Sequence, residues 1–163
     1  NHIISRVMKP AQLRPYASWI SVLSFIAGIV SLYLVFLHYV PEGSTLCVLG
    51  DKFNCDVVNK STYAELFGIP VALLGFLFYV FLWLGSSFLY FRPEAFAKID
   101  LKDLVRAVML ITFIGIAFTL YLTYMEAFTL KTFCIFCLIQ QAIILVVGGI
   151  LTKIYFGGIR GDS

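Results

Sequence analysis

Four long apolar stretches constrain the fold of this chain more than any other feature of its sequence. They cover residues 16–40, 69–91, 104–128 and 133–156, and charged side chains occur only near the ends of the last two. A helix that crosses a bilayer needs about 20 mostly apolar residues, so each stretch is long enough to span. We therefore predict an all-α integral membrane protein built as a four-helix bundle.

The scarcity of charge separates this chain from soluble and disordered proteins. Charged residues make up 13% of the sequence and hydrophobic residues 61%, whereas a soluble domain has about 25% charged residues. The composition also excludes a basic nucleic-acid-binding domain and a small secreted disulfide-rich domain. We expect one catalytic membrane domain over residues 16–156, with tails at 1–15 and 157–163 and no nucleic-acid partner.

The basic residues predict the orientation of the helices in the membrane. Four spans place both termini on one side, and cytoplasmic segments carry an excess of Lys and Arg. Nine basic residues lie in or beside the two tails and the loop between the second and third spans, and only Lys52, Lys60 and Lys131 lie on the other side. We therefore expect cytoplasmic termini and an outward loop at 41–68, facing a periplasm, the cell exterior or the lumen of the endoplasmic reticulum.

Local signals predict a short interfacial helix in the outward loop, over residues 62–67. Thr62 and Glu65 have the spacing of a capping box, and Gly68 is a typical stop. Asp100 is the expected N-cap of the third span. Near the span ends, Glu126 fits a side chain that snorkels to the membrane surface, and His38 fits either an interfacial side chain or a proton relay.

All four cysteines fall on the outward side, where disulfides persist. Cys134 and Cys137 form a Cys-x-x-Cys pair at the start of the fourth span, where the helix dipole favours a thiolate. Cys47 and Cys55 form a second, wider pair in the outward loop. Two pairs on one face favour a thiol–disulfide relay over a four-cysteine zinc site or two purely structural disulfides, so we expect no metal.

A membrane-bound relay needs a carrier of two electrons in the bilayer, and a quinone is the simplest one. Helical spacing places Leu138 and Gln141 on the same face as the Cys134 and Cys137 pair. Gln141 is therefore a candidate quinone ligand, with an interhelical hydrogen bond as the alternative. Its neighbour Gln140 is expected to point elsewhere and to be structural.

Together these motifs carry a family resemblance. Their order is the wide cysteine pair, a serine, a Phe-Gly-Ile-Pro motif, a glycine and the Cys-x-x-Cys pair, which are Cys47 and Cys55, Ser61, residues 67–70, Gly75, and Cys134 with Cys137. The sequence resembles the vitamin K epoxide reductase family over residues 16–156. The resemblance implies a four-helix bundle around a quinone, capped by the outward loop.

The resemblance also implies roles for single residues. Cys137 would lie nearest the quinone, Cys134 would exchange with Cys55, and Cys47 would face a thioredoxin-like partner. Ser61 would lie beside the redox centre, or cap the short helix. Gln141 replaces a tyrosine and Val71 an asparagine of vertebrate members, which weighs against vitamin K epoxide as substrate and leaves quinone reduction open. We expect the quinone to be bound or supported by Ser61, Phe67, Val71, Leu138 and Gln141.

The resulting hypothesis is a quinone-dependent thiol–disulfide oxidoreductase that supports disulfide bond formation. Electrons would pass from the thioredoxin-like partner through the two cysteine pairs to ubiquinone, menaquinone or a vitamin K-type quinone. The alternatives are a vitamin K epoxide reductase proper and a non-catalytic scaffold with structural disulfides. A DsbB-type enzyme fits less well, because its Cys-x-x-Cys pair lies in the first pair of helices.

Overall fold

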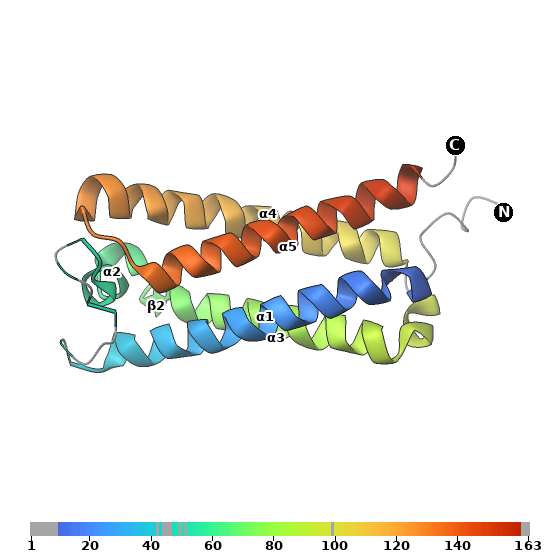
Figure 1. Cartoon of the computed structure of the whole chain (residues 1–163), viewed down its shortest axis with the longest axis horizontal. Coiled ribbons are helices and arrows are strands. Elements are labelled where there is room, and N and C mark those ends of the chain that lie inside the picture. The colour runs from blue at the N-terminus through green and yellow to red at the C-terminus, as the bar shows by residue number, and fades with distance from the viewer. Residues whose placement is uncertain are drawn as a thin grey trace.

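Four long helices run side by side along the molecule (Figure 1). They are α1 (Pro10–Tyr39), α3 (Val71–Phe91), α4 (Leu101–Met125) and α5 (Ile135–Arg160). The computed structural model describes residues 10–41, 43, 47, 48, 50, 52–98 and 100–160. The segments apolar enough to span a membrane are Gln12–Tyr39, Val71–Phe91, Leu101–Leu130 and Ile135–Gly157. The predicted all-α membrane bundle is confirmed, with span ends that differ from the predicted ones by a few residues.

The helices pack through small residues and short polar contacts. Helix α1 packs on α3 and α5, and α4 packs on α5. Between α1 and α3, Gly28 faces the Tyr79 side chain, and the hydroxyls of Ser21 and Ser87 hydrogen-bond at 2.7 Å. Small residues let helix backbones approach closely in a membrane, where burial of apolar surface gives little drive to association. The central core consists of Ile20, Ala27, Tyr79, Leu82, Val147 and Leu151.

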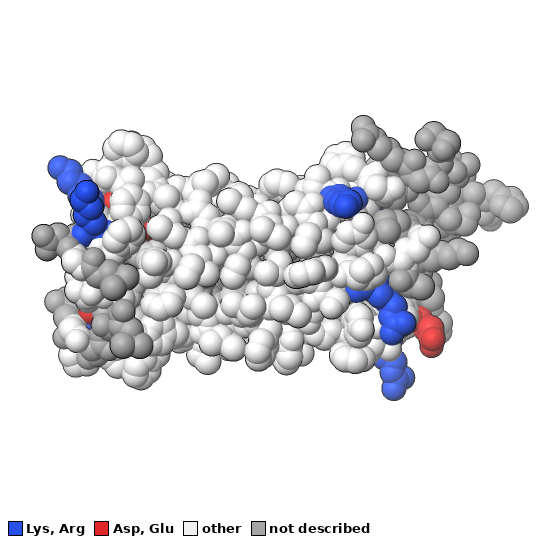
Figure 2. All heavy atoms as spheres, viewed as in Figure 1, with Lys and Arg blue, Asp and Glu red and all other residues white. Residues whose placement is uncertain are grey.

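Charged side chains gather toward the ends of the bundle. On the face drawn in Figure 2, the blue and red side chains lie toward the two ends and the middle of the surface is white. At one end, Arg14 donates to the Tyr90 carbonyl at 3.2 Å and lies over the Tyr90 ring. Hydrocarbon can cover the apolar middle because the backbone polar groups there are paired within helices. This distribution is that of a multi-pass membrane protein.

Short elements close the other end of the bundle, away from the beginning of α1 and the end of α5 (Figure 1). They are α2 (Cys55–Asn59), the 3₁₀ helix η1 (Thr62–Ala64), and the strands β1 (Glu65–Leu66) and β2 (Ile69–Pro70). Two more short helices extend the long ones: η2 (Pro93–Lys98) follows α3, and the π-helix η3 (Glu126–Leu130) follows α4.

The predicted helix over 62–67 is wrong beyond Ala64. Strands β1 and β2 form an antiparallel hairpin, and its two turn residues, Phe67 and Gly68, have φ angles of 55° and 78°. Positive φ at both central positions is typical of a tight hairpin turn and incompatible with a right-handed helix. Thr62 and Glu65 therefore form no capping box, although their spacing fits one.

The predicted caps had different outcomes. Asp100 is the N-cap of α4, as predicted, and its Oδ1 accepts from the Lys102 N–H at 3.2 Å. Ser61 occupies the N-cap position of η1, but its hydroxyl donates backwards to the Val58 carbonyl at 2.7 Å and caps no N–H. Ser61 thus links η1 to the end of α2.

The contact between α4 and α5 gives a test of the packing. A Cβ atom added to Gly148 would lie 2.8 Å from the Ile116 side chain, whereas one added to Gly149 would meet nothing within 4 Å. We predict that Gly148→Leu lowers the free energy of unfolding by about 1–3 kcal/mol, because it overpacks a tight interface. Gly149→Leu is the matched control and should be neutral or slightly stabilising, because glycine disfavours a helix interior. Unfolding in detergent measures both, and equal destabilisation would contradict the packing.

Candidate active site

Three cysteine sulfurs lie together at the loop end of the bundle. Cys47 and Cys55 form a disulfide, and the Cys134 sulfur lies 3.1 Å from the Cys55 sulfur. The three side chains are at most 1% exposed and belong to one apolar cluster with Leu34, Leu37 and Val58. A thiol in contact with a disulfide is the starting geometry for thiol–disulfide exchange.

Backbone pairing brings the loop to the start of α5. The Asn54 N–H donates to the Phe133 carbonyl at 3.1 Å, and the Phe133 N–H donates to the Lys52 carbonyl at 2.9 Å. The Asn54 side chain then caps α2 by accepting from the N–H groups of Asp56 and Val57. Because Cys55 follows Asn54 and Cys134 follows Phe133, this pairing places the two sulfurs side by side.

Cys134 immediately precedes the first residue of α5. Its carbonyl accepts the N–H of Leu138 at 3.1 Å, and its sulfur accepts the N–H of Cys137 at 3.4 Å. The sulfur thus takes the place of an N-cap oxygen, whose partner is the N–H of N2 or N3. This N–H and the helix dipole can stabilise negative charge that develops on the sulfur when a bond to it breaks.

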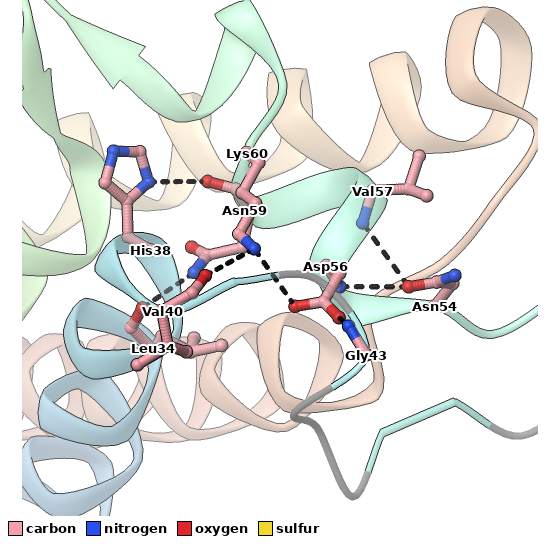
Figure 3. A network of polar contacts seen from close by, with 9 residues as sticks. All are labelled: Leu34, His38, Val40, Gly43, Asn54, Asp56, Val57, Asn59 and Lys60. Atoms are coloured by element: carbon pink, nitrogen blue, oxygen red, sulfur yellow. Dashed lines mark hydrogen bonds and ion pairs between the residues drawn. The ribbon is translucent and has the colours of Figure 1, made fainter.

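A polar network holds α2 against the end of α1 (Figure 3). The Asn59 amide donates to the Leu34 carbonyl, and the Lys60 Nζ donates to the Val40 carbonyl, each at 2.7 Å. His38 Nδ1 lies 2.8 Å from the Asn59 carbonyl oxygen, and its Nε2 lies 3.2 Å from a Glu65 carboxylate oxygen. Both ring nitrogens of His38 therefore serve the attachment of the loop.

Asp56 extends this network to the preceding segment. Its carboxylate accepts from the Gly43 N–H at 3.1 Å and lies 3.8 Å from the Lys60 Nζ (Figure 3). Asp56 and Asn59 are each 5% exposed. Neither residue was predicted from the sequence. The sequence feature that could have identified them is a pair of polar residues in a short apolar run beside Cys55. No sequence motif predicts that such residues face inward.

A cavity of about 500 Å³ lies beside the cysteines. Its walls come mainly from α3 and α4, with smaller parts from α5 and the short elements of the outward loop, and Cys137 is the cysteine that lines it. Most of the lining is apolar, including Leu74, Ile111 and Ile114, which are 39%, 52% and 71% exposed and so open the cavity sideways through the apolar surface. A pocket of this size can hold a small organic molecule.

The predicted ligand residues divide into two groups. Ser61 and Val71 line the cavity. Phe67 does not, because it is at the tip of the hairpin and 97% exposed. Leu138 and Gln141 also lie outside the lining.

The two glutamines have exchanged their expected places. Gln140 lines the cavity, where its Nε2 donates to the buried Ser31 hydroxyl at 2.7 Å. The Tyr79 hydroxyl donates to the backbone carbonyl of Gln140 at 3.4 Å. Gln141 instead accepts a hydrogen bond from Thr123 of α4, which is the interhelical contact considered as its alternative role. The expectation that Gln140 points elsewhere is wrong, because the rotation of α5 is set by its packing on α1 and α4.

Glu126 is also placed differently from the expectation. It is 2% exposed, so it does not snorkel to the membrane surface, and its Oε2 accepts the N–H of Cys134 at 3.1 Å. It also lines the cavity. The signal for it was a carboxyl eight residues before Cys134, near the end of an apolar span, where an ionisable group is by default a functional candidate.

The sulfur atoms of Cys47, Cys55 and Cys134 also lie within 4.8 Å of one another, close enough to be considered as a metal site. Zinc is bound by thiolates. The disulfide leaves Cys47 and Cys55 with no thiolate to offer. With Cys47 and Cys55 joined in a disulfide, the three sulfurs are arranged for thiol–disulfide exchange.

A sequence model of the vitamin K epoxide reductase family matches residues 18–152. The chain belongs to the vitamin K epoxide reductase family. The match spans all four cysteines, Glu126 and the two glutamines. Members of the vitamin K epoxide reductase family are oxidoreductases, so this protein is an integral, multi-pass membrane enzyme whose family suggests a quinone-linked thiol redox role.

The sulfur contact gives a direct test of the site. In a Cys137→Ser variant, we predict a disulfide between Cys55 and Cys134, because Cys134 touches Cys55 and the thiol that would resolve its bond is gone. Adding Cys47→Ser should raise the yield, because it removes the other resolving thiol. Non-reducing mass spectrometry of peptides detects the bond. A Cys134→Ser variant is the control, and preferential linkage of Cys55 to Cys137 in it would contradict the geometry.

Proposed function

We propose that this protein is a quinone-dependent thiol–disulfide oxidoreductase that supports disulfide bond formation. It takes electrons from a thioredoxin-like partner and passes them through the Cys47–Cys55 pair and the Cys134–Cys137 pair to a membrane quinone. The observation that carries this proposal is the contact between the Cys134 and Cys55 sulfurs, with Cys137 on the wall of the cavity. The Cys134–Cys137 pair thus contacts the Cys47–Cys55 pair through Cys134 and the cavity through Cys137.

The electron path balances as follows. The partner's two thiols become a disulfide as the Cys47–Cys55 bond is reduced. The Cys55 thiolate attacks the Cys134 sulfur of a Cys134–Cys137 disulfide, which forms a Cys55–Cys134 bond and releases the Cys137 thiolate. Cys47 then attacks Cys55, which restores the Cys47–Cys55 disulfide and releases Cys134. The resulting Cys134–Cys137 dithiol carries two electrons and two protons, which convert a quinone to a quinol. The structure has the loop pair oxidised and the second pair reduced, which is the state before quinone reduction.

The cavity suits a quinone as the substrate. A quinone ring and tail are apolar and need few polar partners, and the cavity combines apolar walls with a sideways opening toward the bilayer. Gln140 and Asn59 are the side-chain amides of the lining, and each donates to one protein acceptor, the Ser31 hydroxyl and the Leu34 carbonyl. Because an amide has two N–H groups, Gln140 can also donate to a quinone oxygen. Val71 adds no donor at the position of the asparagine of vertebrate members. This supports ubiquinone or menaquinone as substrate over vitamin K epoxide.

The proposed partner works on the outward side. The excess of basic residues around the termini and the loop between α3 and α4 supports cytoplasmic termini, and it leaves the cysteines in an oxidising compartment. Cys47 is 1% exposed in the disulfide-bonded state. Exchange with a thioredoxin-like protein therefore requires Cys47 to be uncovered, whereas exchange between Cys55 and Cys134 does not.

Anaerobic mixing of the reduced, purified protein with ubiquinone, menaquinone or phylloquinone epoxide tests the function. We predict loss of two thiols per quinone reduced and little reaction with the epoxide. A Cys47→Ala variant should still reduce quinone when dithiothreitol supplies electrons but should not oxidise a thioredoxin-like partner. Retained thiols with every quinone would favour a scaffold, and full partner oxidation by Cys47→Ala would remove the loop pair from the path.

The two glutamines give a matched pair of variants. Gln140→Leu should lower quinone reduction by roughly 1–3 kcal/mol of transition-state stabilisation, because it removes an amide donor from the cavity wall beside Cys137. It is made together with Ser31→Ala, so that no buried hydroxyl loses its partner. Gln141→Leu should lower the melting temperature but leave turnover per folded molecule unchanged. Steady-state assays and thermal unfolding separate the two, and the reverse pattern would restore Gln141 as the ligand.

A further inference from the structure

Glu126 connects the redox cysteines to the cavity. It is the first residue of η3, where α4 ends, and its side chain is 2% exposed. Its Oε2 accepts the Cys134 N–H at 3.1 Å, and its backbone carbonyl accepts the Thr132 N–H at 3.1 Å. The same residue lines the cavity beside Cys137. No step of the proposed relay uses its carboxyl group.

The composition of the cavity wall makes this carboxyl group distinctive. Among the described residues that line the cavity, Glu126 is the only carboxylic acid, and none is histidine, lysine or arginine. The other titratable groups on this wall are Cys137, Tyr63 and Tyr79. Within the described part of the chain, no basic side chain forms an ion pair with Glu126. An ionisable group placed this way inside a membrane protein indicates a function.

The two cysteines of the second pair differ in their access to the cavity. Cys137 lines it, so its proton can reach a bound quinone directly. Cys134 is 0% exposed and does not line it. Oxidation of the pair must release both protons, so the proton of Cys134 needs a carrier. Glu126 bonds to the backbone of Cys134 and reaches the cavity wall. The other lining acid that contacts Cys134 is Cys137, which has its own proton to release.

We propose that Glu126 carries the proton of Cys134 into the cavity during quinone reduction. The inference rests on the proposed function and deepens it. Two S–H bonds break and one S–S bond forms between Cys134 and Cys137, while two electrons pass to the quinone. Glu126 takes the proton of Cys134 and delivers it to a quinone oxygen, and the proton of Cys137 completes the quinol. Glu126 itself ends the step unchanged.

The purely structural alternative is that Glu126 only positions Cys134. That role needs a hydrogen-bond acceptor for the Cys134 N–H, which the side-chain carbonyl of glutamine also supplies. A proton carrier needs an acid, which glutamine is not. Glu126→Gln therefore keeps the volume and the acceptor and removes only the proton-carrying group. Glu94→Gln is the control, because Glu94 is an exposed carboxyl in η2, outside the cavity lining.

The experiment follows single-turnover quinone reduction by the reduced protein, in water and in deuterium oxide, with ubiquinone and menaquinone. We expect Glu126→Gln to slow the reaction by about 10²-fold, as for loss of a general acid–base group. It should also change the solvent isotope effect, keep the melting temperature and keep Cys55–Cys134 exchange. Glu94→Gln should behave like the wild type.

The outcomes separate the proposals. Wild-type rates in Glu126→Gln would overturn the proton-carrying role and leave Glu126 as a positioning residue. If Glu126→Gln folds poorly, Glu126→Asp decides: substantial activity supports the role of the carboxyl group, and an equal loss in both variants overturns it. Recovery of Glu126→Ala by added formate would support it as well. Absence of quinone reduction in the wild type would overturn the proposed function, and this inference with it.

Discussion

The redox site depends on one short backbone pairing between the outward loop and the segment before α5. Phe133 exchanges hydrogen bonds with Asn54 and Lys52, and the next residues on the two strands of this contact are Cys55 and Cys134. Two cysteines that are 79 positions apart in the chain thereby come within contact distance. Without this pairing the loop would have to find the second cysteine pair by diffusion, and the loss of orientation would slow exchange.

The bilayer sets the second constraint, because polar groups inside the bundle cannot turn to water. These groups form hydrogen bonds between helices instead: Ser31 with Gln140, Thr123 with Gln141, and Tyr79 with the backbone of α5. These pairs fix the rotation of α5 and so decide which side chains face the cavity. The same few hydrogen bonds thus order the interior of the bundle and the lining of the cavity. Glu126 is paired as well, since its Oε2 accepts the backbone N–H of Cys134, and this contact holds an acid on the cavity wall.

The parts that could be predicted from the residues are those with a local physical signal. The lengths of the apolar stretches identified four spans, and Asp100 identified the N-cap of α4. The spacing of Cys134 and Cys137 marked a redox pair at a helix start. Predictions that depended on orientation were less successful: a helical wheel placed Gln141 rather than Gln140 on the face of the cysteines, and capping spacing extended a helix to Phe67, with Gly68 as its stop. The wheel fails because packing rotates a helix that is apolar on all sides, and the cap fails because positive φ at two residues favours a hairpin.

The sequence by itself determined that the protein lies in a membrane, how many helices span it and which residues can carry thiol chemistry. The length and hydropathy of a stretch and the type of a residue have their effects without long-range contacts. Only the tertiary structure brings Cys134 against Cys55 and Cys137 to a cavity wall, an arrangement that the family resemblance implied and no local pattern predicted. It also decided that Glu126 and Gln140, not Gln141, line its wall. Such choices depend on how distant segments pack, and a burial of 2% or a contact of 3.1 Å has no counterpart in a local sequence pattern.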